Sequence, residues 1–257
     1  ETAEPAMTRS ILDHVPSGVS LLVWAALWEL IGRFGGIDLV PPMSHIALTA
    51  IDIVQTDKFI AALVVTAQAF GIGMALAIVI GIPLGVLMGV WRPAERLLDV
   101  WVNIFISAPL TALVPALMPL LGIGQTTVVA TVFLFAVWVL VIDTRAGIHH
   151  VGGSLLDMAR LFGASRAQIF FKVLLPGALP EILTGLRLAV VRGVKGVVIG
   201  QIIIALLGFG ELFELYLQNL LMEEFWALVF VVFALAFVLV EAVGLVERRF
   251  DFYAGSR

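Results

Sequence analysis

Charge and cysteine are the two things that this chain has least of. Only 13% of its 257 residues are charged, whereas a soluble domain of this size carries about 25%. There is no cysteine, which excludes disulfides, thiol nucleophiles and thiolate metal sites. The formal net charge is -4 and no basic run occurs, which argues against a nucleic-acid partner because phosphate binding needs clustered Lys and Arg. Together with a mean hydropathy of +1.10, this predicts an integral membrane protein.

Several catalytic signatures are missing too. No G-x-x-x-x-G-K-[ST] loop is present, so we expect ATP phosphates to be bound by another chain. The G-x-S-x-G elbow is absent and no predicted span contains histidine, which makes an intramembrane serine protease improbable. His149 and His150 are adjacent without an acidic cluster nearby in sequence, so we expect them to be solvated rather than to bind a metal. The sequence therefore predicts a chain without catalysis, metal or cofactor of its own.

Long apolar stretches replace those motifs. A helix needs roughly 20 apolar residues to cross about 30 Å of hydrocarbon, and six stretches approach that length, with no strand pattern between them. The third is interrupted by Asn103 and three prolines, which are tolerated where neighbours or a cavity satisfy the freed carbonyls. The second contains Gly81 and Pro83, where we expect a break. The predicted fold class is all-α, with about six spans at 17–34, 59–90, 97–120, 125–145, 181–206 and 225–246.

The basic residues between spans predict the orientation. Three regions that must share one side, after the second, fourth and sixth spans, are rich in Arg and Lys, and basic loops stay in the cytoplasm. The other side is acidic, and a half-polar stretch at 44–57 reads as interfacial. We therefore expect one membrane domain over 1–257, with a cytoplasmic segment at 1–16 and a cytoplasmic tail at 247–257. The residues on the basic side are Arg92, Arg96, Arg145, Arg160, Arg166, Lys172, Arg248, Arg249 and Arg257.

A polar, hinged stretch lies between the fourth and fifth spans. Ser154 followed by Asp157, and Ser165 followed by Gln168, both fit the capping box of a helix start. Gly163 stands between them, where a helix can end in the left-handed conformation. The pattern predicts two short helices at an angle, the second stopped before Pro176. One interpretation is a helix on the membrane surface, and the other is an element that docks into another protein.

The stretch resembles a known loop. Asp157-Met158-Ala159, Gly163-Ala164-Ser165 and Leu175-Pro176 are similar to the EAA loop of ATP-binding-cassette importer permeases, with Asp in place of the usual Glu and Met in place of the first Ala. The wider sequence resembles the sulfonate, nitrate and taurine type permeases, over roughly 40–250. That likeness rests on PAERLLD at 93–99, LPGALPEILTGLRLA at 175–189 and GFG at 208–210.

The resemblance implies a type I importer permease. The loop at 152–176 would be the coupling helix, seated on a separate ATPase that carries ATP and Mg²⁺. A second permease copy, two such ATPase subunits and a solute-binding protein would complete the assembly in the bacterial inner membrane, with both termini in the cytoplasm. The residues implied in coupling are Asp157, Ala159, Arg160, Gly163, Ala164, Ser165 and Pro176.

The fifth span carries charge where charge is costly. Arg192 and Lys195 lie near its middle, about 60° apart around a helix, and each costs at least ~2.5 kcal/mol at the bilayer centre. One hypothesis is that they line a path for a small anion, and the other is that they pair with Glu241 or with a neighbouring chain. Arg187, nearer the cytoplasmic end, is expected to snorkel. Beside them runs a stripe of small residues that allows close helix packing: Gly185, Ala189, Gly193, Gly196 and Gly200.

The sequence leaves alternatives open for the role of the third span, for the class of protein and for the substrate. Ser107 and Thr111 in the third span border the pathway in related permeases, but the prolines around them could simply kink a packed helix.

An ion-coupled secondary transporter is the alternative function. Such a transporter usually needs acidic relays inside the membrane, for which Glu29 and Glu241 are the candidates. A membrane scaffold would need no charge at the midplane. Organic sulfonates, nitrate, bicarbonate, small aromatic acids and thiamine precursors are all compatible substrates.

Overall fold

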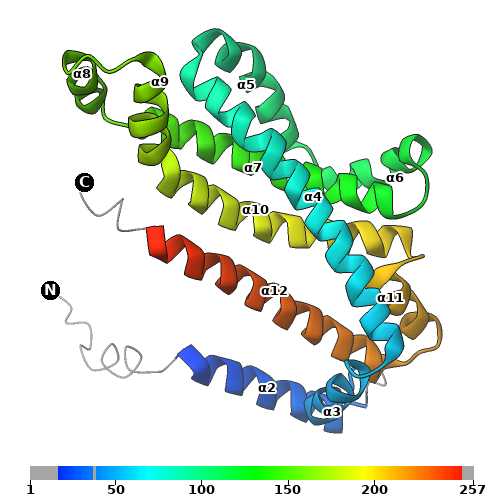
Figure 1. Ribbon diagram of the computed structural model, residues 1–257. Coiled ribbons are helices and arrows are strands. Elements are labelled where there is room, and N and C mark those ends of the chain that lie inside the picture. The colour runs from blue at the N-terminus through cyan, green and yellow to red at the C-terminus, as the bar shows by residue number, and fades with distance from the viewer. Residues whose placement is uncertain (1–16, 37–38, 251–257) are drawn as a thin grey trace, which may run out of the picture. The chain divides into compact units, whose positions relative to one another are not determined.

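The computed structural model describes residues 17–36 and 39–250, and within these ranges every regular element is a helix. The all-α prediction is therefore confirmed for the described chain (Figure 1). The elements are α2 (Ser17–Phe34), α3 (Met43–Ile53), α4 (Asp57–Val90), α5 (Arg92–Ser107), α6 (Leu110–Leu121), α7 (Gln125–His150), α8 (Gly153–Leu161), α9 (Arg166–Ile169), the π-helix η1 (Phe170–Leu174), α10 (Leu175–Ile204), α11 (Gly208–Gln218) and α12 (Met222–Phe250).

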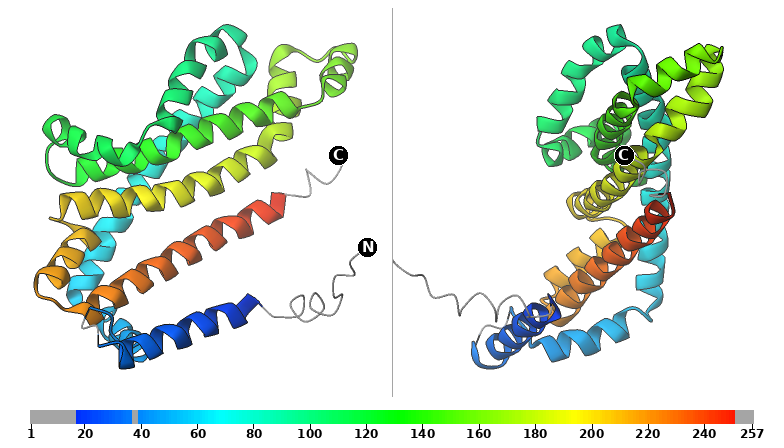
Figure 2. Two further views of the ribbon diagram at one scale, coloured as in Figure 1. Left: turned by 180° about the vertical axis from the view of Figure 1, so that it is seen from behind. Right: turned by 90° about the vertical axis from the view of Figure 1, so that its left-hand side faces the viewer.

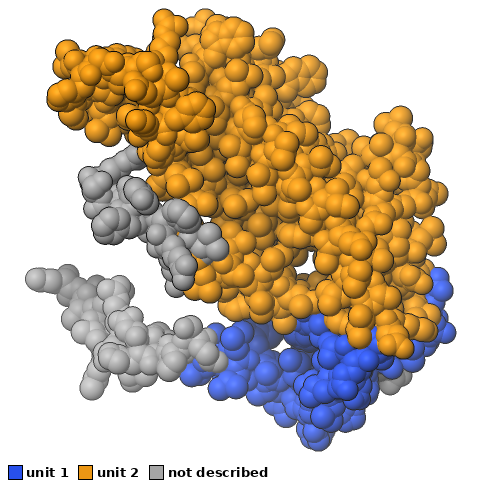
Figure 3. All heavy atoms as spheres, in the orientation of Figure 1, with its two compact units in different colours: residues 1–56, 216–231 blue, residues 57–215, 232–257 orange. Residues whose placement is uncertain are grey.

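The chain divides into two compact units (Figure 3). The first contains residues 1–56 and 216–231, and the second contains residues 57–215 and 232–257. The prediction of a single permease domain over 1–257 stays a prediction.

The second unit is organised around α4, α7 and α10. Helices α7 and α10 run side by side in both views of Figure 2, and small residues let them approach. A Cβ built on Gly185 would lie 2.6 Å from the Cβ of Asp143, and one on Gly73 of α4 would lie 2.6 Å from the Cβ of Val132. Ala189 is fully buried. The small-residue stripe expected along 185–200 thus packs against α7 and α4, as close helix contact in membranes requires.

The apolar helices only partly follow the expected spans. Three described helices are long and apolar enough to cross a membrane, or up to five if each bent pair counts as one span. The expected break in the second span is wrong, because α4 continues through Pro83 to Val90. The expected third span is two helices, α5 and α6, bent by 102°, since Ala108 is extended and Pro109 precedes α6. The first expected span coincides with α2, Ser17–Phe34.

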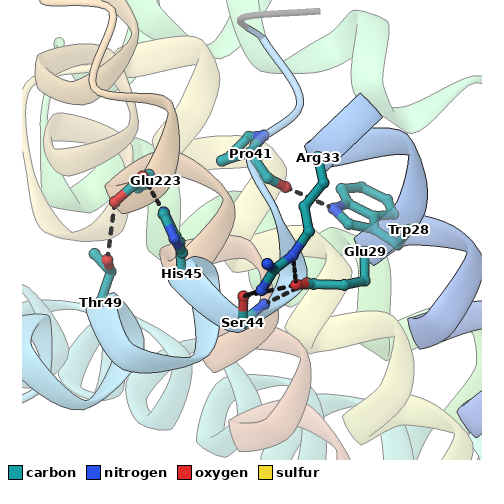
Figure 4. Close-up of polar contacts among 8 residues, drawn as sticks. All are labelled: Trp28, Glu29, Arg33, Pro41, Ser44, His45, Thr49 and Glu223. Atoms are coloured by element: carbon teal, nitrogen blue, oxygen red, sulfur yellow. Dashed lines mark hydrogen bonds and ion pairs between the residues drawn. The ribbon is translucent and has the colours of Figure 1, made fainter. Parts of the chain in front are cut away.

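Polar contacts organise the first unit (Figure 4). The Trp28 indole N–H donates to the Pro41 carbonyl at 3.1 Å, and the Ser44 backbone N–H donates to Glu29 Oε2 at 2.8 Å. Arg33 pairs with the same Glu29 side chain at 2.5 Å. These bonds join the end of α2 to the start of α3, across the loop that contains two prolines. The half-polar stretch at 44–57 forms a short helix over most of its length, α3, Met43–Ile53.

Candidate functional site

Helix α8 opens the hinged stretch, but not as expected. It begins at Gly153 with Gly152 as its N-cap, and no side chain caps it. The predicted Ser154–Asp157 capping box is wrong, because the N-cap is Gly152, two residues before Ser154, and Ser154 lies inside the first turn of the helix. Asp157 instead pairs with Arg160 at 2.8 Å, three residues along the same helix. Both side chains are exposed, so the pair is worth at most about 1 kcal/mol.

The end of α8 is the glycine turn that the sequence predicts. Gly163 has φ +75°, in the left-handed region that glycine adopts without steric cost. Its N–H donates to the Arg160 carbonyl at 3.0 Å, and the Ala164 N–H donates to the Ala159 carbonyl at 3.0 Å. This pair of bonds is a Schellman motif, which satisfies carbonyls left free at a helix end. The turn is therefore fixed by the backbone rather than by a partner.

The second capping box is confirmed. The Gln168 N–H donates to Ser165 Oγ at 3.3 Å, and the Ser165 N–H donates to Gln168 Oε1 at 2.8 Å. Ser165 and Gln168 thus satisfy each other's free amides at the start of α9. Local bonds on the two sides of Gly163 therefore end α8 and start α9.

The predicted stop before Pro176 is wrong. From Arg166 the chain stays helical through η1 into α10, which ends at Ile204. Pro176 lies in the first turn of α10, where a proline is tolerated. The hydrogen-bond pattern widens just before it, because the Leu175 N–H donates to the Phe170 carbonyl, five residues back. The second half of the hinge is therefore continuous with α10, so a displacement of α9 would act on α10 directly.

Large apolar side chains lie on the surface of the hinge. None of the residues of α8, α9 or η1 is buried. Leu161 is 88% exposed and Phe162 is 84% exposed, directly before Gly163. Leu155 and Met158 of α8 are also exposed. An apolar patch of this kind on an otherwise capped, polar element indicates an interaction surface.

The charges of α10 separate into two groups. Arg187 lies 3.8 Å from Glu241 and 3.4 Å from Glu247 of α12, and the expectation that it snorkels stays a prediction. Arg192 and Lys195 are both exposed and make no ion pair or hydrogen bond with described residues. Pairing of either one with Glu241 is therefore wrong within one chain, because the Glu241 carboxylate faces Arg187. The two cations share a face beside the buried glycine stripe, as predicted.

Lys195 borders an apolar groove in the second unit. The groove holds about 410 Å³ and is walled by α10 and α12. Val198, Phe233 and Phe237 contribute to its walls. The inner surface of the groove is formed by apolar atoms, so Lys195 contributes the methylene part of its side chain to the wall.

Ser107 and Thr111 are brought together at one bend. Ser107 is the last residue of α5 and Thr111 lies in the first turn of α6. Both side chains are exposed, so neither is buried in the packing at the 102° bend. Their place in a pathway stays a prediction.

One polar cluster was missed by sequence reasoning. Gln201 of α10 is fully buried, and its Oε1 accepts from the Phe209 N–H at 3.2 Å and lies 3.0 Å from the Thr66 hydroxyl. The cluster holds the turn in which Ala205 has φ +55° and Gly208 has φ +61°, between α10 and α11. A lone Gln within the run VVIGQIII was the available signal.

The two histidines face different carboxylates. His149 Nε2 lies 3.8 Å from Glu95 and His150 Nδ1 lies 3.4 Å from Glu181. Among the described residues no group of three His, Cys, Asp or Glu side chains is arranged to hold a metal. The adjacent pair in the sequence is thus split between two neighbours.

Known proteins resemble large parts of this chain. Residues 81–252 match the model of a family described as "Binding-protein-dependent transport system inner membrane component". The taurine transport system permease protein TauC of Escherichia coli K12 is 33% identical over 52% of this chain and 49% of its own length. The bicarbonate transport system permease protein CmpB of Synechococcus elongatus is 31% identical over 49% of this chain and 43% of its own length.

A longer match covers more of the chain. The glycine betaine/proline betaine transport system permease protein ProW of Escherichia coli K12 is 30% identical over 79% of this chain and 55% of its own length. The chain spans about half the length of the curated relatives that it matches. Among solved structures, a chain of the inward-facing MetNI methionine ABC transporter superposes with a TM-score of 0.62 at 23% identity, covering 75% of this chain and 94% of that chain. This last likeness shows the shared all-α membrane fold.

Proposed function

The chain belongs to the family of binding-protein-dependent transport system inner membrane components, and from that membership we propose that it is the permease subunit of an ATP-driven importer. The observation that carries the proposal is the hinge of α8, Gly163 and α9. It lies inside the matched residues 81–252, local bonds end α8 and start α9, and it exposes Leu161 and Phe162.

The hinge supports a role in coupling. A separate ATPase that closes on ATP has to move the permease through an element stiff enough to transmit force. The Schellman turn at Gly163 and the capping box at Ser165 make the hinge such an element. Because α9 continues as a helix into α10, a movement of the hinge would be transmitted to α10. Asp157, Arg160 and Pro176 fit this role as parts of the same stretch, with the Asp157–Arg160 pair on the exposed surface of α8.

The cationic face of α10 supports an anionic solute. Arg192 and Lys195 have no partner among the described residues, and unpaired charges in a span are expensive unless they serve a path. The relatives named for taurine, bicarbonate and nitrate transport are compatible with this reading. We propose a small anion as solute, with Ser107 and Thr111 at the border of the path.

The remaining assembly follows from the same proposal. A second copy of this permease would supply the other half of the path, two ATPase subunits would bind ATP and Mg²⁺, and a solute-binding protein would deliver the solute on the outer side. The chain itself would catalyse no bond chemistry and bind no cofactor. We place both termini on the cytoplasmic side of the bacterial inner membrane, because the basic residues gather there.

Co-purification tests the proposal. The tagged chain, extracted from its own membrane in mild detergent, is expected to carry a stoichiometric ATPase. Leu161→Asp should remove the ATPase, because it places a charge in the apolar contact, while the folded chain should be unaffected since Leu161 is 88% exposed. Leu161→Met is the matched control and should retain the ATPase. Isolation of the wild-type chain without any ATPase would refute the proposal.

The ion-coupled alternative has no observation in its favour. Glu29 is held by Arg33 and Ser44, and Glu241 faces Arg187. Both candidate relay carboxylates are thus engaged by fixed partners, which is the arrangement of structural rather than proton-carrying groups.

A further inference from the structure

A second cavity lies behind the hinge, within the second unit. It holds about 910 Å³ and is walled by the end of α4, the start of α5, the end of α7, and α8, α9 and η1. Helices α5, α8 and α9 project from the same end of this unit (Figures 1 and 2). Its lining includes three arginines, one from each of three elements: Arg92 of α5, Arg160 of α8 and Arg166 of α9. We call it the arginine cavity.

The positive charge of the arginine cavity is not neutralised from within. Arg160 is paired with Asp157 at 2.8 Å. Arg92 and Arg166 make no ion pair or hydrogen bond with described residues, and both are exposed. Glu95 also lines the cavity, but its carboxylate is approached by Arg145 at 3.9 Å and by His149 at 3.8 Å. Two free guanidiniums therefore border one cavity, whose walls focus their field.

Apart from the three arginines, Glu95 and His149, the lining is apolar. Leu156, Ile169, Phe170 and Leu174 contribute to the walls, so a ligand with an organic part would be held by contact as well as by charge. Guanidinium groups bind phosphate oxygens in a bidentate geometry. The volume lies within the range of about 300–1,000 Å³ that is typical of small-molecule sites. The chemistry of the arginine cavity thus matches an organic phosphate.

The position of the cavity allows two sources of such a phosphate. Helix α4 has 34 residues and is about 51 Å long at 1.5 Å per residue, whereas the hydrocarbon core is about 30 Å thick. At least one end of α4 therefore extends past the hydrocarbon, and we place the Val90 end, which lines the cavity, on the cytoplasmic side because Arg92 and Arg96 follow it. Lipid headgroups and soluble phosphates both reach that depth.

From these observations we propose that the arginine cavity binds a phosphate-bearing anion, held by Arg92 and Arg166 with Arg160 beside them. Because these arginines come from α5, α8 and α9, the bound anion would tie the hinge to the end of the spanning helices. The consequence for coupling rests on the proposed function, but binding itself does not. An occupied cavity would stiffen the hinge, and an empty one would leave it looser.

Direct binding tests this proposal. The complex is purified with the partners that it carries, stripped of lipid, and titrated separately with inorganic phosphate, dioctanoyl phosphatidylglycerol and dioctanoyl phosphatidylcholine. We expect at least one of the first two to bind more tightly than the zwitterionic phosphatidylcholine. Arg92→Gln combined with Arg166→Gln should raise the Kd at least tenfold. Binding of phosphatidylglycerol without phosphate would identify the lipid as the source, and equal binding of phosphate would identify a soluble anion.

A matched control removes the same charge outside the cavity. Arg96→Gln combined with Lys172→Gln should leave the Kd within twofold, because neither side chain lines the arginine cavity. The proposal is overturned if no anion binds the wild-type complex, as would happen if a segment of a partner filled the cavity. It is also overturned if the two double variants weaken binding equally. Either result leaves the ATPase co-purification, and with it the importer proposal, unaffected.

Discussion

The packed helices of the second unit and the α8–α9 hinge both depend on glycine, for opposite reasons. In α4 a Cβ on Gly73 would meet the Val132 side chain at 2.6 Å and the Val129 carbonyl oxygen at 2.9 Å. At Gly163 a Cβ would meet nothing within 4 Å, but φ is +75°. The first glycine is required for space and the second for backbone conformation. Side-chain size therefore decides what the packed region accepts, and left-handed propensity decides what the hinge accepts.

The two regions also differ in what covers them. The interface of α4, α7 and α10 buries Val132, Leu140 and Ala189 completely. Its side chains therefore find all their packing partners within one chain. The hinge leaves Leu161 and Phe162 almost fully exposed. Substitutions in the packed interface should therefore lower the free energy of unfolding. Substitutions in the exposed hinge should instead lower solute uptake.

The largest effect is expected from Gly73→Val. Overpacking against Val132 and the Val129 carbonyl should lower the free energy of unfolding by about 3 kcal/mol, at the upper end of such effects. Gly71→Val, two residues away on the same helix with nothing within 4 Å of its Cβ, should change it by less than about 1 kcal/mol. Chemical denaturation in detergent measures both. Equal losses would show that α4 and α7 do not approach as closely as described.

Gly163→Val should act on coupling instead. A left-handed backbone costs an ordinary residue roughly 1–2 kcal/mol, so the turn should rearrange and solute uptake should fall about tenfold, while ATP hydrolysis by the assembled complex continues. Gly163→Asn should keep most uptake, because Asn tolerates this conformation. Uptake and hydrolysis are measured together in proteoliposomes. Full uptake by the Val variant would remove the hinge from the coupling mechanism.

Arg192→Gln combined with Lys195→Gln probes the exposed face of α10. We expect uptake of an anionic solute to fall about fivefold, corresponding to a coupling of about 1 kcal/mol between solute and charge. Assembly and the unfolding transition should be retained, since both side chains are exposed. Radiolabelled uptake together with size-exclusion chromatography checks this. Unchanged uptake would discard the pathway role of both residues.

The smallest effect is expected from Arg187→Gln on the same helix. Its pairs with Glu241 and Glu247 are partly exposed, and such pairs contribute about 0–1 kcal/mol. The free energy of unfolding should fall by about 0.5 kcal/mol, and solute uptake should not change. Chemical denaturation in detergent measures the first, and radiolabelled uptake measures the second. A drop in uptake equal to that of the Arg192 and Lys195 double variant would erase the distinction between paired and unpaired charge on α10.

The sequence predicted local features well where the signal was local. The glycine turn at Gly163 and the capping box of Ser165 and Gln168 could both be predicted from the sequence, because each depends on residues within five positions of one another. The Ser154–Asp157 box failed although it has the same spacing. The pattern was present, but the helix began at Gly153, two residues too early for the Ser154 hydroxyl to act as its cap.

Proline was the least reliable signal. Pro83 lies inside a continuous α4, and Pro176 lies in the first turn of α10, although both were expected to break or end a helix. At Pro109 the chain does bend sharply, between α5 and α6. Inside a helix a proline removes one hydrogen bond, and neighbouring helices decide whether the helix survives that loss, whereas in the first turn no such bond is lost.

By itself the sequence determined the helical membrane character of this protein, the hinge turn and the shared face of Arg192 and Lys195, because hydropathy, left-handed propensity and helical periodicity act over a few residues. Tertiary structure alone decided which charges are paired, that three arginines from α5, α8 and α9 border one cavity, and that Gln201 holds the turn before α11. Those outcomes depend on contacts between residues far apart in the chain, and such distances are set by packing.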